Sequence, residues 1–464
     1  MIGIRHIALG AALAVLPALS SAADFALPAF EQVTLDNGAQ LLLMEKHDVP
    51  LVALSARLRG GSLIDPPGKE GSAALLAEML QKGAGTRDAK QFAEAVDSAG
   101  GELQIASGLE SLQLDAQFLA RDAQLMIDLS SDALLRPTLS ADEFAKVKDR
   151  AIDSLAAAKD DDPRQLTGTY GNAWLFRGQP YGRPVSGDET SLAKVTLDDL
   201  RAYRQQLGGD RLIVAVVGDF QAAQMKQSLQ AAFGAWPKAA GALSEAGAKS
   251  PETGRRVLLV DKPGATQSYF WLGNVGVDRR NPELPAQTLV NTVFGGRFTS
   301  MINTELRIKS GLSYGARSSL ERFDKPGAAS ISSFTRTETT GQALDLALAT
   351  LDRLHKEGIA APMRDSAKNY VLGQFPPKLE TAPDLADKLA ELAFYGLDHN
   401  DVDTYANRIS AVTPEQLTKA IAVYPDSRNL AIVIIGDAGK LRDTAKRYGP
   451  LTEIKITDPH FVPR

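Results

Sequence analysis

The sequence predicts an α+β protein made of two homologous domains of the α/β-sandwich type, each a mixed sheet with helices packed on it. Residues 211–220 (RLIVAVVGDF) and 429–437 (NLAIVIIGD) are apolar runs that close in Gly-Asp, the pattern of a buried strand entering a turn. A Val-Thr pair opens a helix-like stretch ahead of each run, at residues 195–196 and 412–413. The Val-Thr pairs are 217 residues apart and the Gly-Asp pairs 218, which indicates a duplicated unit of about 220 residues.

Strand and helix patterns occur together in the individual halves. Residues 40–46 and 51–58 have the composition of strands, and a turn-like His-Asp-Val-Pro segment joins them. Ser140 and Glu143 form a capping-box signature ahead of a helix with buried-type apolar positions. Sheet-type and helix-type segments in both halves place each half in the α+β class.

The chain divides into four segments. Residues 1–23 have the charged start, apolar middle and small-residue end of a secretory signal peptide. Their apolar run is about 13 residues long, short of the ~20 needed to span a bilayer, although a membrane anchor is the alternative. An N-terminal domain is expected at 24–237, an exposed linker rich in Ala, Gly, Ser and Glu at 238–254, and a C-terminal domain at 255–464. We therefore expect export to a bacterial periplasm, with no integral membrane segment.

Composition excludes several classes of site. The 464 residues carry 51 Lys plus Arg against 56 Asp plus Glu, a formal charge of −5, which leaves no overall electrostatic footprint for nucleic acid. The absence of Cys excludes disulfides, thiolate catalysis, Cys-ligated zinc and iron–sulfur clusters. Only five His are present, so a histidine metal site has few possible places.

One N-terminal segment keeps the framework of a known motif but lacks the side chains that carry out its chemistry. Residues 60–86 read GGSLIDPPGKEGSAALLAEMLQKGAGT. This stretch resembles the zinc-helix region of the pitrilysin or insulinase-like peptidases, in which His-x-x-Glu-His on a helix supplies two imidazole ligands and a carboxylate that deprotonates the zinc-bound water. The resemblance places Ala74, Ala77 and Glu78 where the family has His, Glu and His. None of the three can perform the family role, so the resemblance implies no metal and no catalytic residue at this motif.

The family's third zinc ligand is a Glu some seventy-five residues further on. The resemblance brings it to the neighbourhood of Ser154, with Asp153 one position away. Even if Asp153 met Glu78, two carboxylates would make a weak site for a hard cation rather than a hydrolytic zinc centre. We therefore expect no cofactor bound by this chain.

The second half keeps another family signature. Residues 294–316 read FGGRFTSMINTELRIKSGLSYGA. The segment resembles the family stretch with Gly-Gly, then Glu-Leu-Arg, then Gly-Leu-x-Tyr, and so implies that Arg307 and Tyr314 are the substrate-binding Arg and Tyr. Tyr can donate a hydrogen bond to a developing oxyanion, and Arg can hold a peptide carbonyl or carboxylate. The alternative is a solvated helix residue and a surface strand residue.

The resemblance implies half of a clam-like chamber and a division of labour between two chains. In the favoured interpretation the protein is a non-catalytic, peptide-binding subunit of a periplasmic zinc peptidase, whose partner is a zinc-bearing homologous subunit in a heterodimer. Two alternatives remain: a scaffold or binding protein with the same fold and no proteolytic role, and an autonomous enzyme with unrecognised ligands. A retained Arg307–Tyr314 pair favours the first over the second.

Overall fold

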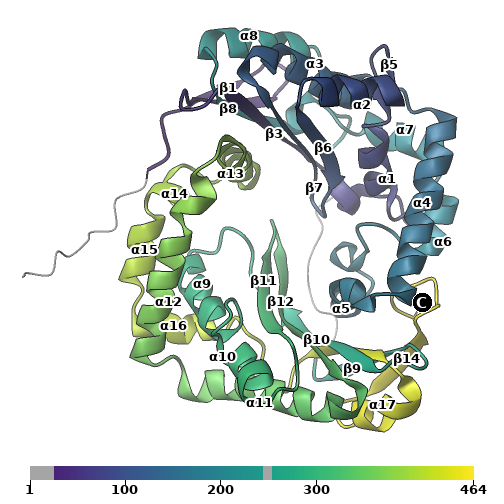
Figure 1. Cartoon of the computed structure of the whole chain (residues 1–464), viewed down its shortest axis with the longest axis vertical. Coiled ribbons are helices and arrows are strands. Elements are labelled where there is room, and N and C mark those ends of the chain that lie inside the picture. Colours follow the sequence, from purple (N-terminus) through teal and green to yellow (C-terminus); the bar gives the residue numbers. More distant parts are fainter. Residues whose placement is uncertain (1–25, 244–252, 464) are drawn as a thin grey trace, which may run out of the picture.

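A computed structural model describes residues 26–243 and 253–463 of the chain. Two six-stranded sheets lie at opposite ends of the molecule, and helices cover them and connect them (Figure 1). The predicted signal peptide, and residues 244–252 of the predicted linker, lie outside the described residues. The boundaries expected between the two domains stay a prediction.

The first sheet has the order β1-β2-β8-β3-β7-β6. Its strands are β1 Glu31–Thr34, β2 Gln40–Glu45, β3 Leu51–Arg59, β6 Glu102–Ser107, β7 Ser111–Leu119 and β8 Leu212–Gly218. The β2–β8 pair is parallel and the other four pairs are antiparallel. A small separate ribbon pairs β4 Gly83–Ala84 with β5 Arg87–Asp88.

The second sheet has the order β11-β12-β10-β13-β9-β14. Its strands are β9 Arg256–Asp261, β10 Gln267–Val275, β11 Ala316–Arg322, β12 Pro326–Arg336, β13 Ala431–Gly436 and β14 Leu451–Lys455. Read from the β14 end, β9-β13-β10-β12-β11 repeats β2-β8-β3-β7-β6, again with a parallel pair first and antiparallel pairs after it. The repeated order supports the duplication that the sequence offsets indicate.

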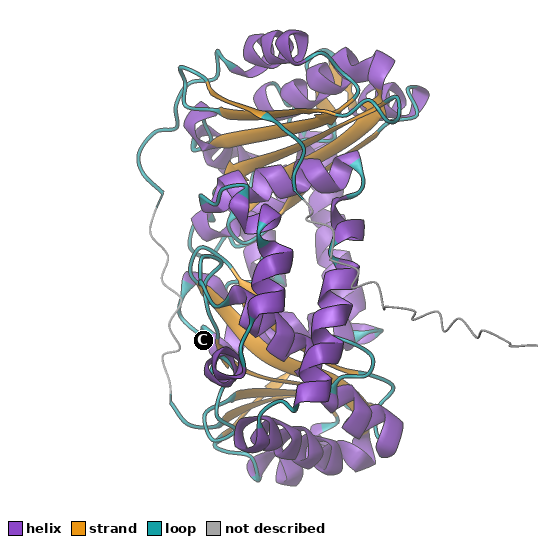
Figure 2. Cartoon of the chain, turned by 90° about the vertical axis from the view of Figure 1, so that its left-hand side faces the viewer, coloured by secondary structure: helices purple, strands orange, loops and turns teal. Residues whose placement is uncertain are grey.

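Helices form the outer layers and the connections between the sheets (Figure 2). In the first half they are α1 Ser72–Met79, α2 Ala89–Ser98, α3 Ala123–Leu135, α4 Ala141–Asp160, α5 Thr167–Leu175, α6 Glu189–Lys194, α7 Leu197–Gln205 and α8 Ala222–Phe233. In the second half they are α9 Leu284–Phe294, α10 Met301–Asn303, α11 Thr340–Glu357, α12 Ala361–Gln374, α13 Ala382–Tyr395, α14 Asn400–Asp403, α15 Tyr405–Ala411, α16 Pro414–Ile421 and α17 Ala438–Lys446. Short 3₁₀ helices are η1 Gly61–Ile64, η2 Ala120–Asp122, η3 Pro163–Leu166, η4 Pro180–Gly182, η5 Gly209–Arg211, η7 Thr337–Thr339 and η8 Pro376–Leu379, and η6 Thr304–Lys309 is a π-helix.

The two halves exchange helices. Helix α13 of the second half packs on β3 and β8 of the first sheet, and α5 of the first half packs on β10 and β13 of the second (Figure 1). The contact of α5 is close: a Cβ on Gly171 would lie 2.5 Å from the Trp271 ring. Each sheet is thus covered on one face by helices of its own half and on the other by a helix of the opposite half.

This exchange explains why β8 and β13 are apolar without alternation. In β8, Val214 and Val216 face the core beneath the first half's own helices, whereas Ala215 and Val217 face α13. All seven residues of β8 are therefore buried. A strand buried on both faces has no polar face to show a period of two.

One predicted local feature is wrong. Helix α4 begins after Ser140 as expected, but the Ser140 side chain makes no capping hydrogen bond. The Glu143 carboxylate accepts from Lys146 Nζ at 2.7 Å instead of from the Ser140 backbone. The duplicated helices α7 and α16 do carry complete capping boxes, at Thr196 and Thr413. Across residues 26–243 and 253–463, no helix has the length and apolar character to cross a membrane.

Candidate functional site

The loop before α1 fixes the position of the degenerate motif. Asp65 accepts hydrogen bonds from the backbone N–H groups of Gly71 and Ala73, each at 2.8 Å, and so caps the start of the helix. Gly71 has φ 97°, a left-handed conformation that favours glycine at this turn. Burial raises the pKa of Asp65 to about 7, although both backbone donors oppose the shift.

The three motif positions lie on α1 without ligand chemistry. Ala77 is buried in the core of the first half, while Ala74 and Glu78 line a cavity of about 850 Å³. The Glu78 carboxylate forms an ion pair with Arg150 of α4. Two methyl groups and a carboxylate engaged by arginine do not fit a zinc ion, whose sites need three or four N, S or O ligands. In the part of the chain that the structure describes, no group of three or more His, Asp or Glu side chains could hold a metal ion.

The cavity beside α1 is enclosed by both halves of the chain. Ser154 of α4 lines it together with Ala74 and Glu78, whereas Asp153 is exposed and is not part of the lining. The far wall comes from α5 and from β11, where Asn172 donates to the Glu321 carboxylate at 3.1 and 3.3 Å. Burial raises the pKa of Glu321. The region of the expected third ligand thus does meet α1, but with a hydroxyl instead of a carboxylate.

Arg307 and Tyr314 form a second, separate region. Arg307 lies on η6, and its guanidinium stacks 4.3 Å from the Tyr314 ring centroid and 4.8 Å from that of Phe298. Tyr314 is 75% exposed and Phe298 is 59% exposed. Neither Arg307 nor Tyr314 lines the cavity beside α1, so the two sequence-predicted regions do not meet within one chain.

The backbone around Arg307 is unusual and firmly held. A π-helix is rare and is often found at functional sites. Leu306 is fully buried in the core of the second half, and Glu305 pairs with Lys309 at 3.0 Å and with Arg353 of α11 at 2.9 Å. These anchors hold the turn in place while Arg307 projects from it towards two exposed rings.

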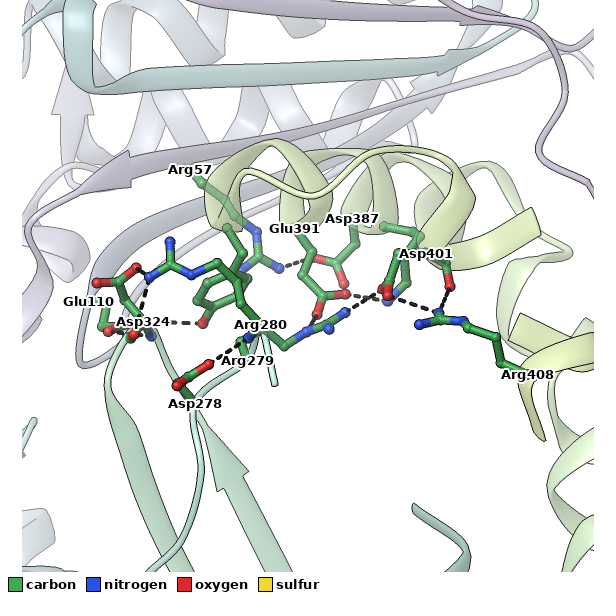
Figure 3. A network of polar contacts seen from close by, with 12 residues as sticks. Arg57, Glu110, Asp278, Arg279, Arg280, Asp324, Asp387, Glu391, Asp401 and Arg408 are labelled. Atoms are coloured by element: carbon green, nitrogen blue, oxygen red, sulfur yellow. Dashed lines mark hydrogen bonds and ion pairs between the residues drawn. The ribbon is translucent and has the colours of Figure 1, made fainter. Parts of the chain in front are cut away.

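Glu110 is a polar centre that the sequence does not reveal. Its carboxylate accepts from Tyr181 Oη at 2.7 Å, from Tyr395 Oη at 3.2 Å and from the backbone N–H of Asp324 at 2.9 Å. Figure 3 shows Glu110 and Asp324 at one end of a network that continues through Arg279, Glu391 and Asp401. Burial raises the pKa of Glu110, and the three donors oppose this shift.

Phe298 is also missed by sequence reasoning. The signal for it was an aromatic residue two positions after Gly-Gly, in a segment without apolar periodicity. For Glu110, an acidic residue in a hairpin turn gives no such signal, because its partners lie between 71 and 285 residues away in sequence.

Two family models match this chain. Residues 41–189 match the model for insulinase (peptidase family M16), and residues 194–370 match that for the peptidase M16 inactive domain. The chain belongs to the insulinase-like M16 peptidase family. With α1 lacking both imidazoles and the general base, it is a non-catalytic member of that family.

Relatives with solved structures share the whole fold. A peptidase M16 inactive domain from Pseudomonas fluorescens superposes with a TM-score of 0.81 at 22% identity, covering 88% of this chain and 98% of that one. A structure described as a protease from Helicobacter pylori gives 0.80 at 19% identity, covering 88% and 100%. These likenesses bear out the predicted fold class.

The sequence relatives include a protein named as a zinc protease and one named as a non-peptidase homolog. An uncharacterized zinc protease of Mycobacterium tuberculosis is 26% identical over 433 residues, which is 92% of this chain and 98% of that protein. The non-peptidase homolog YmxG of Helicobacter pylori is 23% identical over 402 residues, or 85% and 91%.

Proposed function

We propose that this protein is the non-catalytic, peptide-binding subunit of a periplasmic zinc metallopeptidase, and that it supplies Arg307 and Tyr314 to the zinc site of a partner. The partner is a zinc-bearing homologous subunit, and the two chains form a heterodimer around a peptide or unfolded polypeptide. The signal-like residues 1–23 support export to the periplasm.

The observation that carries the proposal is the contact of the half-buried Arg307 guanidinium with two exposed rings, those of Tyr314 and Phe298. A cation held against aromatic faces is ordered before any ligand arrives, so less conformational entropy is lost on binding. The Tyr314 hydroxyl has no hydrogen-bond partner among residues 26–243 and 253–463, as expected if it reaches beyond the chain. Exposed aromatic and Arg side chains are also the residue types enriched in protein interfaces.

The chemistry of the pair suits a site completed by another chain. A tyrosine hydroxyl can donate to the oxyanion that develops on a scissile carbonyl, and the planar guanidinium can hold a peptide carbonyl or carboxylate through two parallel hydrogen bonds. This chain contributes positioning and charge stabilisation. The zinc and the water that it activates belong to the partner, because α1 has no ligands for them.

One feature supports an alternative function, that of a catalytically dead scaffold or binding protein. The cavity beside α1 has lost its ligands and is occupied at its edge by the Glu78–Arg150 ion pair, which is expected of a catalytically dead scaffold or binding protein. A scaffold has no use for an ordered, exposed Arg307–Tyr314 pair. The two functions therefore predict different effects of removing the Tyr314 hydroxyl: a loss of turnover in the complex for the first and no change for the scaffold.

The test is reconstitution with a zinc-bearing relative from the same organism. Tyr314→Phe removes only the donor and should lower kcat of the complex by ~10²–10³-fold, the usual effect of losing one oxyanion donor. Arg307→Lys keeps the charge, loses the planar fork and should raise KM for peptide. Tyr269→Phe is the matched control, because among the described residues its hydroxyl has a single long hydrogen bond, to the nearby Gln267 at 3.4 Å.

Size-exclusion chromatography of the same complexes gives the second readout. All three variants should elute with the partner as wild type does, because Tyr314→Phe and Tyr269→Phe keep the packing of their rings and Arg307→Lys keeps the positive charge. If Tyr314→Phe keeps turnover within about twofold of wild type, the Tyr314 hydroxyl does not contribute to catalysis. This chain would then only form part of the chamber wall. A chain that stays monomeric beside every zinc-bearing relative tested would favour the scaffold.

A further inference from the structure

Arg322 is a partly buried arginine with no countercharge among residues 26–243 and 253–463. It ends β11, and neither its Nε nor its Nη2 atom has contact with solvent or a hydrogen-bond partner. None of the residues that the structure describes forms an ion pair with it. An arginine keeps its charge in proteins, so leaving it desolvated and unpaired is costly.

The nearest charged groups do not neutralise Arg322. The adjacent Glu321 lines the larger cavity beside α1, where Asn172 of α5 donates to it. Burial is the main cause that lowers the pKa of Arg322, and the positive charge of Arg279 also lowers it. Arg279 is itself paired with Glu391 at 2.9 Å and with Asp401 at 3.0 Å. The register of β11 shifts between Leu320 and Arg322, and such irregularities often re-aim a side chain beside a functional site.

Arg322 lines a cavity of about 340 Å³ with an unusual composition. The cavity lies between α9, β11, α12 and η8, and Lys378 of η8 is its other charged residue. The remaining polar lining consists of hydroxyl and amide side chains: Thr288, Asn291, Thr292, Ser318, Ser319, Tyr370, Gln374 and Tyr405. The hydroxyls of Thr288 and Thr292 donate to backbone carbonyls, and that of Ser318 donates to Asn291 Oδ1. No Asp or Glu is among the described residues that line it. Lys378 is exposed and has no ion pair with any residue that the structure describes.

We propose that this cavity binds a small oxyanion, a carboxylate or a phosphate, with Arg322 as the principal cation and Lys378 as a second one. Two cations, the amide N–H groups of Asn291 and Gln374, and the absence of acids among the described lining residues favour an anion over a cation or an apolar ligand. Guanidinium is the group best matched to the oxygens of carboxylate and phosphate, and Lys adds a point charge. The volume is at the lower end for ligand sites, which fits a small anion. This site is independent of the Arg307–Tyr314 proposal.

The test uses the purified full chain, with inorganic phosphate and succinate as probes and sodium chloride at matched ionic strength as the reference. In isothermal titration calorimetry, at least one probe should bind with a stoichiometry near one, and the same probe should raise the melting temperature of the protein. Binding of phosphate alone identifies a phosphate site, and binding of succinate alone a carboxylate site.

Three variants decide whether Arg322 is the cause. Arg322→Gln should weaken binding at least about tenfold, and without a probe it should fold at least as stably as wild type, because it removes an unpaired charge. Lys378→Ala, at an exposed position, should weaken binding severalfold. Arg317→Gln is the matched control: Arg317 lies on the same strand, is exposed, and should bind as wild type does. Equal binding by wild type and Arg322→Gln, or binding of neither probe to wild type, overturns the proposal.

Discussion

Three positions of α1 lack the side chains that the resemblance to zinc peptidases calls for, and Ser154 of α4 lies where a third ligand is expected. Ala74 and Ala77 present methyl groups, and Glu78 is held by Arg150 of α4. The capping by Asp65 is intact, so the helix is built and positioned although its ligands are gone. The loss is one of chemistry and not of fold.

Purified alone, the protein should bind no stoichiometric zinc and cleave no peptide. Elemental analysis of the chain after dialysis against trace zinc, with a mixed-peptide digest, measures both. One tightly held zinc per chain, together with activity that a chelator abolishes, would restore the interpretation as an autonomous enzyme.

A second prediction at the residue scale concerns Glu110. Its carboxylate satisfies donors from η4, from the end of α13 and from the turn between β11 and β12. Glu110→Ala leaves three donors without a partner and should lower the free energy of unfolding by about 3 kcal/mol. Glu110→Gln keeps one carbonyl acceptor and should cost less. Urea denaturation of both variants measures the difference, and equal midpoints for wild type and Glu110→Ala would contradict the assigned role.

At the scale of elements, α13 is held to its surroundings by both apolar and ionic contacts. Its buried side is formed by residues such as Leu385 and Leu389 against the first sheet, and Glu391 and Asp387 lie on its polar side (Figure 3). Arg57 of β3 pairs with Asp387 at 2.5 Å, which ties the helix to the sheet of the other half. Arg279 ties the same helix to the loop that follows β10.

The contacts of Glu391 predict that the free energy of unfolding depends on pH. Burial alone would raise the pKa of Glu391, but Lys388 and Arg279 outweigh it and hold the pKa at about 2, below the ordinary 4.5. A lowered pKa in the folded state contributes stability above about pH 4.5, and this contribution is lost as the pH falls towards 2. Glu391→Gln should therefore be less stable than wild type by about 3 kcal/mol at pH 7, and the gap should narrow as the pH falls below about 5 and close near pH 2.

Urea denaturation of wild type and Glu391→Gln at several pH values between 3 and 7 measures the gap. Other carboxyl groups titrate in the same window, so the difference between the two proteins is the quantity that counts. A gap that stays constant over this range would show that the charge of Glu391 does not stabilise the fold.

At the scale of the whole molecule, the exchange of α5 and α13 makes the two halves depend on each other. Each sheet has one face on which a helix of the opposite half packs, so neither half alone buries all of its apolar residues. Apolar burial of this extent is worth far more than the net stability of a domain. The halves are therefore expected to behave as one folding unit.

Fragments divided within residues 244–252 test this dependence. Each fragment alone should aggregate or remain poorly folded, and co-expression should give a stable complex that elutes at the size of the intact chain. Leu389→Asp in the second fragment is the control, because it places a charge on the fully buried side of α13 and should prevent association. Two fragments that are each soluble, folded and without affinity for the other would contradict the exchange.

Much of the fold could be predicted from the sequence because local residue patterns determine where buried strands and helix starts occur. The unbroken apolar runs at β8 and β13 and the Val-Thr pairs that open a helix ahead of each run, at nearly the same offset, predicted two similar α+β halves. The structure adds that Thr196 and Thr413 cap those helices. The loss of zinc ligands at Ala74, Ala77 and Glu78 was equally local. Ser140 shows the limit, because its local pattern predicts a capping box and its side chain makes no capping hydrogen bond.

Only the tertiary structure decided which half covers which sheet, and which polar groups meet. The apolar pattern of β8 requires a cover on both faces but does not say that α13 provides one of them. Glu110 and Tyr395 lie 285 residues apart, and Arg322 lies beside Glu321 in sequence yet is not neutralised by it. Hydrophobic burial is non-directional, so sequence specifies which residues are buried, whereas long-range packing determines what each of them contacts.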